Sequence, residues 1–144
     1  MDQRLSLISI GVADMAAARA FYVDGMGWQP SGPTGDDILF FQLPGLVLSI
    51  ILHSHLSGDV TLDNASVPIG YRGFAVAVNV HARDEVHQTM AAAEAAGGKI
   101  LKQPVETDWG GYSGYFADPD GNIWEAAHAP GWEITADGQT IMSF

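Results

Sequence analysis

One succession of local patterns, a strand, a helix and a hairpin, occurs twice along these 144 residues, with a further strand before the hairpin in the second half. In the first half we expect a strand at 5–12, a helix at 15–23 and a hairpin at 38–43 and 46–52. In the second half we expect a strand at 73–80, a helix at 83–96, a strand from 99 to 104, and a hairpin at 111–117 and 122–127. A curved sheet has one apolar face that needs a cover, so this repeat predicts two similar α+β modules that share one core.

Short polar residues, proline and glycine mark the ends of these elements. Asp14 is a good N-cap for the first helix. Pro44-Gly45 suits a tight turn between antiparallel strands, and Asp118-Pro119-Asp120-Gly121 has proline and glycine where a turn favours them. The stretch 57–71 has turn residues without periodicity and is typical of a linker. Within a single domain we expect module one at about 5–56, the linker at about 57–71, module two at about 72–128 and a C-terminal tail at about 129–144.

Composition limits the partners and the compartment. Apolar residues make up 47% of the chain, enough for the core of one domain. The formal charge of −11 would repel phosphate backbones and anionic lipids, so neither nucleic acid nor membrane is expected as a partner. The absence of cysteine excludes disulfides and thiolate chemistry. No signal peptide and no long apolar segment is evident, so we expect a cytoplasmic protein.

Two groups of motifs give the chain a family resemblance. They are Val12-Ala13-Asp14 with Ala20-Phe21-Tyr22 and Gly27-Trp28, and the late stretch Tyr115-Phe116-Ala117-Asp118-Pro119-Asp120-Gly121-Asn122-Ile123-Trp124-Glu125. Together they resemble the vicinal oxygen chelate (VOC) superfamily of glyoxalase I, extradiol dioxygenases and bleomycin-resistance proteins. The resemblance covers nearly the whole chain and implies two βαβββ modules, each a cupped mixed sheet, around a pocket.

The resemblance also implies where a metal would bind. In metal-using members four ligands come from the first and last strands of the two modules, and the neighbouring motifs place them at Leu7, Ser49, Phe74 and Glu125. Leucine and phenylalanine offer no lone pair, so only Glu125 is suited to ligate such an ion. We therefore expect no cofactor and no Zn, Ni, Fe or Mn ion at these positions. The metal-dependent mechanism of glyoxalases would then lack the ion that polarises the substrate.

His53-Ser54-His55 keeps a metal-dependent alternative open. If the strand through Ser49 continued, alternation would send His53 and His55 to the same face, although His53 would lie about 13 Å along the strand. The simpler interpretation is a polar strand end. The alternative is a lyase, isomerase or dioxygenase that holds a divalent metal through Glu125 and His53 or His55.

Aromatic residues supply the candidate pocket wall. The motif positions place Phe74, Trp109, Tyr112 and Phe116 near the family pocket, and flat rings suit aromatic ligands. For Phe74 and Phe116 core packing is the favoured interpretation. Trp109 lies in the loop Asp108-Trp109-Gly110-Gly111 and favours ligand contact. Three other tryptophans are interpreted as structural: Trp28, Trp124 and Trp132.

Glu125 is the candidate catalytic residue, because an apolar stretch precedes it and a lone buried carboxylate is costly. Alternation in the expected strand puts Arg72 on the face of Phe74, so we expect Arg72, the Ser49 hydroxyl or a water to hold Glu125. The candidate ligand-binding residues are Leu7, Ser49, His53, Arg72, Phe74, Trp109, Tyr112 and Phe116.

These inferences predict metal-independent binding of a small organic, aromatic or amphipathic molecule, as in the bleomycin-resistance-like branch. If the chain is an enzyme, the resemblance implies a glyoxalase-like lyase or a dioxygenase-like activity. An interaction module with a filled cavity is a third class. A homodimer is also expected, from the resemblance and from the apolar stretches 46–52 and 132–144.

Overall fold

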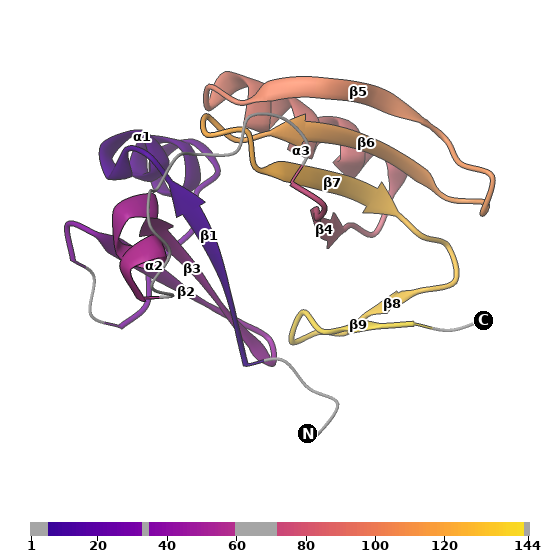
Figure 1. Ribbon diagram of the computed structural model, residues 1–144. Coiled ribbons are helices and arrows are strands. Elements are labelled where there is room, and N and C mark those ends of the chain that lie inside the picture. Colours follow the sequence, from indigo (N-terminus) through magenta and orange to yellow (C-terminus); the bar gives the residue numbers. More distant parts are fainter. Residues whose placement is uncertain (1–5, 33–34, 60–71, 143–144) are drawn as a thin grey trace. The chain divides into compact units, whose positions relative to one another are not determined.

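The computed structural model describes residues 6–32, 35–59 and 72–142, which form two compact units, Met1–Arg72 and Gly73–Phe144 (Figure 1). Each unit has its own sheet, and each is described by itself below. Among the described residues, no helix has the length and hydropathy that a membrane span requires.

The first unit is a three-stranded mixed sheet with helices. Its elements are β1 (Leu7–Val12), α1 (Met15–Arg19), the π-helix η1 (Ala20–Gly25), β2 (Ile38–Leu43), β3 (Leu46–Leu52) and α2 (His53–Asp59). The strand order is β1-β3-β2, with β1 parallel and β2 antiparallel to β3. The Asp14 carboxylate caps α1 by accepting from the backbone N–H groups of Ala16 and Ala17.

One face of this first sheet forms a core with the helices. Alternation along the strands sends a set of large apolar side chains to the same face, and each is at most 2% exposed: Ile10, Val12, Leu39, Phe41, Leu48 and Ile50. Phe21 and Tyr22 of η1 are equally buried, and Tyr22 lies beside Phe41 with ring centroids 6.3 Å apart. Burial of this apolar surface stabilises the unit.

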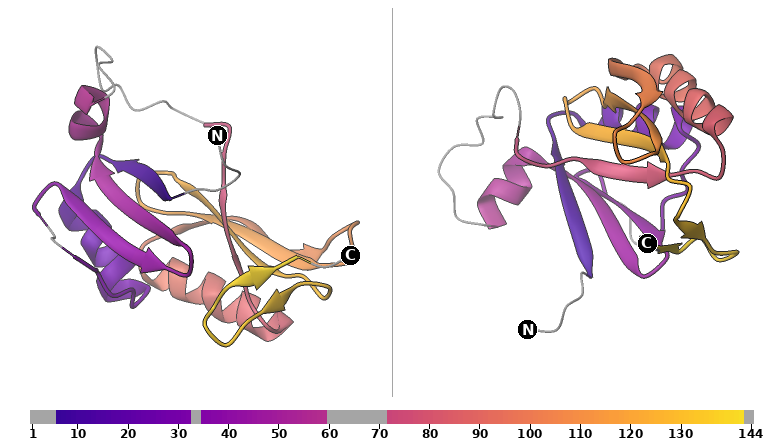
Figure 2. Two further views of the ribbon diagram at one scale, coloured as in Figure 1. Left: turned by 90° about the horizontal axis from the view of Figure 1, so that it is seen from below. Right: turned by 90° about the vertical axis from the view of Figure 1, so that its right-hand side faces the viewer.

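The second unit has a larger sheet and a longer helix. Its elements are β4 (Val76–Asn79), α3 (Arg83–Ala95), β5 (Lys99–Glu106), β6 (Tyr112–Ala117), β7 (Ile123–His128), β8 (Glu133–Ile134) and β9 (Thr140–Ile141). The order of the main sheet is β4-β7-β6-β5, with β4 parallel to β7, while β8 and β9 form a separate hairpin. Figure 2 shows α3 along one face of the main sheet.

The face of this sheet toward α3 is the core of the second unit. Val86, Met90 and Ala93 of α3 are buried, and Phe116 and Trp124 stack with ring centroids 6.3 Å apart. Phe116 and Trp124 are also register partners on β6 and β7. Tyr115 precedes Phe116 on β6 and Glu125 follows Trp124 on β7, so alternation points both side chains to the face away from α3.

The expected α+β fold of two βαβββ-like modules is confirmed, with local differences. In the first unit, the described residues between η1 and β2 form no strand, although the Ser31 amide donates to the Phe40 carbonyl. The second module's first strand begins at Val76 rather than at Gly73, because Gly73 has a φ of 81°. The expected linker overlaps α2 up to Asp59, and its remainder, 60–71, lies outside the described residues.

Candidate functional site

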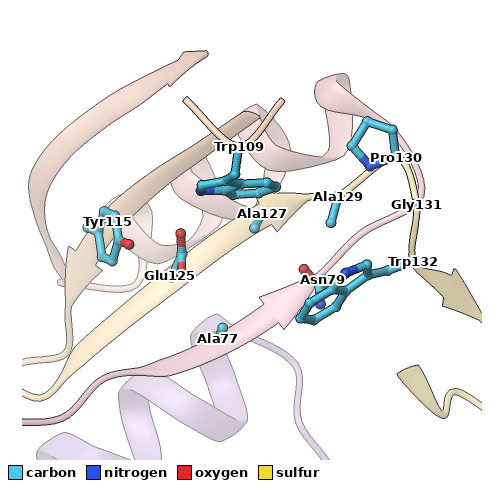
Figure 3. Close-up of a pocket in the computed structure, with 10 residues that line it drawn as sticks. All are labelled: Ala77, Asn79, Trp109, Tyr115, Glu125, Ala127, Ala129, Pro130, Gly131 and Trp132. Carbon is cyan, nitrogen blue, oxygen red and sulfur yellow. The ribbon is translucent and has the colours of Figure 1, made fainter. Parts of the chain in front are cut away.

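A pocket of about 580 Å³ opens on the face of the second sheet away from α3 (Figure 3). Every residue that lines it belongs to the second unit. The lining comes from β4, β6, β7, the loop before β6 and the segment after β7: Ala77, Asn79, Trp109, Tyr115, Glu125, Ala127, Ala129, Pro130, Gly131 and Trp132. The described wall of the pocket is therefore built by the second module.

Small side chains give the pocket its depth, and aromatic rings give it walls. Ala77 and Ala127 lie on β4 and β7, where larger side chains would fill the space above the sheet. In Figure 3 Trp109 stands over Ala127, and Trp132 lies beside Asn79. These two indoles are 59% and 41% exposed, so they keep apolar surface available for contact.

Glu125 and Tyr115 form the polar centre of the pocket. They are register partners on β7 and β6, and the Tyr115 hydroxyl donates a hydrogen bond to the Glu125 carboxylate. Burial raises the pKa of Tyr115 above its usual 10.0. The hydrogen bond to Glu125 and the negative charge of Glu125 raise this pKa further. Tyr115 thus remains a protonated donor at neutral pH, and the carboxylate keeps lone pairs for a ligand.

A closed turn holds Trp109 at the pocket. The Gly111 amide donates to the Thr107 hydroxyl at 2.9 Å, and the Gly110 amide donates to the Thr107 carbonyl at 3.0 Å. The Trp109 ring covers Gly111 so closely that a Cβ at position 111 would overlap it. Gly110 has a φ of 88°, which favours glycine. The two glycines therefore fix where the indole lies.

Two of the predicted aromatic contacts lie on the other face of the sheet. The Tyr112 hydroxyl lies 3.0 Å from Nε2 of His87 on α3, and the Arg83 guanidinium stands over the Tyr112 ring. Phe116 is 2% exposed and belongs to the core, as its favoured interpretation had it. Neither residue lines the pocket formed by the described residues of this unit. The predicted Trp109 does line it, as does Glu125.

The family's metal positions do not offer a set of ligands. The Ser49 hydroxyl is 1% exposed and donates to the Ser9 hydroxyl at 2.8 Å, which leaves the Glu125 carboxylate as the one charged group of the four. Leu7 is 44% exposed at the start of β1 and has no donor atom in its side chain. Phe74 precedes β4 and is 41% exposed. A divalent ion needs several nitrogen, sulfur or oxygen ligands, so these residues do not fit one.

When the two sheets are matched by strand register, the second-module counterpart of Leu7 is not Phe74. Ser9 and Ser49 pair as Ala77 and Glu125 do, so Leu7, two residues before Ser9, corresponds to Ala75 rather than Phe74. The strand begins only at Val76, so the strand alternation that placed Arg72 with Phe74 does not apply. Arg72 is the last residue of the first unit, and its pairing with Glu125 stays a prediction.

The two histidines of the alternative metal site lie on a helix, which overturns the strand geometry expected for them. α2 begins at His53, directly after β3, so alternation ends there. The His53 ring occupies the space that a Cβ on Gly11 would need, and His55 lies 3.7 Å from the Asp37 carboxylate. Within the described ranges, no three side chains of His, Cys, Asp or Glu gather in a way that could hold a metal.

Sequence reasoning missed three parts of the pocket. The predicted hairpin implied that Tyr115 and Glu125 face each other across the turn at 118–121, and this symmetry was the available signal for Tyr115. Ala77 and Asn79 carry no motif and are found only by register with β7. Trp132 was interpreted as structural, but the chain after β7 returns past the end of β4 and brings its indole to the pocket.

The comparison with known families assigns the chain to one superfamily. Residues 4–126 match the Glyoxalase/Bleomycin resistance protein/Dioxygenase superfamily. The chain belongs to this superfamily. A glyoxalase-related enzyme from Fulvimarina pelagi is 39% identical to this VOC protein, with a TM-score of 0.91 over 99% of this chain and 100% of that chain. No curated protein matches the chain.

More distant structures show the shared fold alone. A glyoxalase/bleomycin resistance protein/dioxygenase family enzyme from Burkholderia phytofirmans PsJN is 23% identical, with a TM-score of 0.76 over 87% of this chain and 98% of that chain. A lactoylglutathione lyase from Agrobacterium tumefaciens is also 23% identical, with a TM-score of 0.65 over 89% of this chain and 95% of that chain. The match to the superfamily ends at residue 126, before Trp132 and the rest of that pocket wall.

Proposed function

We propose that this VOC protein binds a small organic molecule with a flat apolar body in the pocket of its second unit, without a metal at the family positions. The observation that carries the proposal is the Glu125–Tyr115 pair at the centre of a pocket walled by Trp109 and Trp132. A volume of about 580 Å³ lies within the range of about 300–1,000 Å³ that is usual for ligand pockets. Apolar walls with a few convergent polar groups are typical of such sites.

Each lining group has a definite task in this proposal. The indoles of Trp109 and Trp132 contact the faces or edges of the ligand, and the alanines of β4 and β7 let it reach the sheet. Glu125 accepts a hydrogen bond from the ligand while Tyr115 orients the carboxylate. If the bound molecule carries an acidic proton at this point, Glu125 is the group placed to accept it.

A screen of small aromatic compounds tests the proposal. Ligand-observed NMR with the full chain, purified without a nickel column and treated with chelator, should find one-ring and two-ring compounds that bind. Trp109→Ala should weaken that binding about tenfold, because one buried aromatic contact is lost. Leu101→Ala is the matched control, since Leu101 is 46% exposed on β5 and does not line the pocket.

Two results would count against the proposal. Equal binding by the Trp109→Ala and Leu101→Ala proteins would place the ligand elsewhere. Stoichiometric metal in protein purified without a nickel column, together with loss of ligand binding when the metal is removed, would show that binding depends on a metal. The homodimer stays a separate prediction, which light scattering at micromolar concentration checks.

A further inference from the structure

The charged and polar groups of the pocket favour one class of ligand. Glu125 is the carboxylate among the lining residues, and no Lys, Arg or His belongs to that described lining. The other polar side chains are the neutral Asn79 and Tyr115, and Tyr115 already donates to Glu125. The described lining thus has one negatively charged side chain and no positively charged one.

The walls add to this preference for positive charge. The faces of tryptophan and tyrosine rings attract cations through their quadrupole. The Tyr115 ring already has a cation beside it, because the Lys102 ammonium of β5 lies 5.9 Å from the ring centroid. Trp109 and Trp132 present indole surface to the pocket itself. The formal charge of −11 further raises the local concentration of cations over anions.

We propose that the ligand of this pocket is a protonated arylalkylamine, whose ammonium binds Glu125 and whose ring lies against Trp109 above Ala127. This inference rests on the proposed function and names the class of molecule bound. Glu125 and Ala127 are two residues apart on one strand face, a spacing of about 7 Å. A two-carbon linker between the ring and the nitrogen suits that spacing. The ammonium donates to the carboxylate lone pairs that Tyr115 leaves free, and Asn79 offers a second acceptor.

Three probes of nearly equal shape test the charge preference. Phenethylamine, phenethyl alcohol and phenylacetate are cationic, neutral and anionic at pH 7, and calorimetric titration of the full chain compares their affinities. We expect phenethylamine to bind about tenfold more tightly than the alcohol, because its hydrogen bond to the carboxylate is charge-assisted. Phenylacetate should bind more weakly than the alcohol, because like charges repel.

Three variants test whether Glu125 is the source of the preference. In Glu125→Gln the affinity ratio of phenethylamine to phenethyl alcohol should fall to about one, while the alcohol binds about as before. Glu94→Gln removes the same charge from the exposed surface of α3, so the ratio should stay near that of the unsubstituted protein. Lys102→Gln should raise the affinity for phenethylamine slightly, since it removes a like charge near the pocket.

The outcomes separate this inference from the proposed function. Equal affinities for the three probes would overturn the proposal that the ligand is an arylalkylamine. So would a preference for phenethylamine over the alcohol that persists in Glu125→Gln. If the alcohol binds in those cases and Trp109→Ala weakens it, the aromatic pocket of the proposed function stands. Failure of all three probes to bind overturns the inference, and the wider aromatic screen then decides the proposed function alone.

Discussion

The two units place different side chains at corresponding positions of the same sheet face. In the first, Ser49 of β3 has Ser9 and Phe40 as its register partners; in the second, Glu125 of β7 has Ala77 and Tyr115. The Ser49 and Ser9 hydroxyls bond to each other. Glu125 instead has an alanine on one side, and a tyrosine hydroxyl reaches it from the other.

This difference shows how a repeated backbone acquires one site. In the first unit the Ser49 hydroxyl gives its proton to Ser9, and Ser49 is 1% exposed, so little of it is accessible to a ligand. A carboxylate that receives one hydrogen bond beside a methyl group keeps acceptors and has space in front of it. The fold supplies equivalent positions in both modules. Serine at position 9 bonds to its strand partner, whereas alanine at position 77 leaves space for a ligand beside Glu125.

The largest expected effect is a loss of stability when a core phenylalanine of either unit is removed, and it tests whether the two helix-facing positions are equivalent. Register matches Phe41 with Phe116, and both are 2% exposed in their own cores. Changing either to alanine should lower the free energy of unfolding by about 3–5 kcal/mol, because each leaves a cavity. Chemical denaturation of the two proteins measures this, and a loss below about 1 kcal/mol for one of them would break the equivalence.

The hairpin turns of the two units should differ in their sensitivity. The Asp118 carboxylate is 3% exposed and accepts from the Asn122 amide at 2.8 Å, the Asn122 side chain at 2.7 Å and the Asp120 amide at 2.9 Å. Asp118→Ala should cost about 2 kcal/mol of stability, since buried donors lose their acceptor. Gly45→Ala, at a φ of 72°, should cost about 1 kcal/mol. Denaturation midpoints that reverse this order would contradict the contrast.

Ser49 and Glu125 should respond in opposite ways. Ser49→Ala should lower stability by about 1 kcal/mol, because Ser9 loses a hydrogen bond, and should leave phenethylamine affinity unchanged. Glu125→Gln should change stability by less than about 0.5 kcal/mol, because glutamine still accepts from Tyr115, and should weaken amine binding. Thermal unfolding and calorimetry on the same two proteins check both halves. Unchanged amine binding by Glu125→Gln would remove the functional contrast.

The smallest effect concerns the pH dependence of Tyr115, whose counterpart in the first unit is Phe40. The pKa of Tyr115 is raised above 10.0, so the folded protein keeps this proton longer than the unfolded chain. Its contribution to stability is present below pH 10 and declines as the pH rises through the folded pKa. Glu125→Gln should lower this pKa toward 10.0, and the tyrosinate absorbance difference from Tyr115→Phe measures it. An unchanged titration would show that Glu125 does not act on Tyr115.

Local signals predicted most of the elements, and their errors have physical causes. The strand expected at 46–52 ends where β3 ends, but the alternative metal site requires that strand to continue through His53, and α2 begins there instead. The sequence pattern predicts a strand from Gly73, but the positive φ of Gly73 takes the backbone out of the extended conformation, and β4 begins at Val76. Its motif position predicts Tyr112 near the pocket, although alternation on β6 puts it on the α3 face.

The sequence by itself determined the family, the paired modules, the turn that sets the β6–β7 register, and the position of Glu125 on the face opposite Trp124. These follow from local conformational preference and from strand alternation, which act over a few residues. Only the tertiary structure decided that Tyr115 holds Glu125, that Ala77 opens the pocket and that Trp132 closes its end. Those contacts join strands and a tail far apart in the chain, and their positions depend on how whole elements pack together.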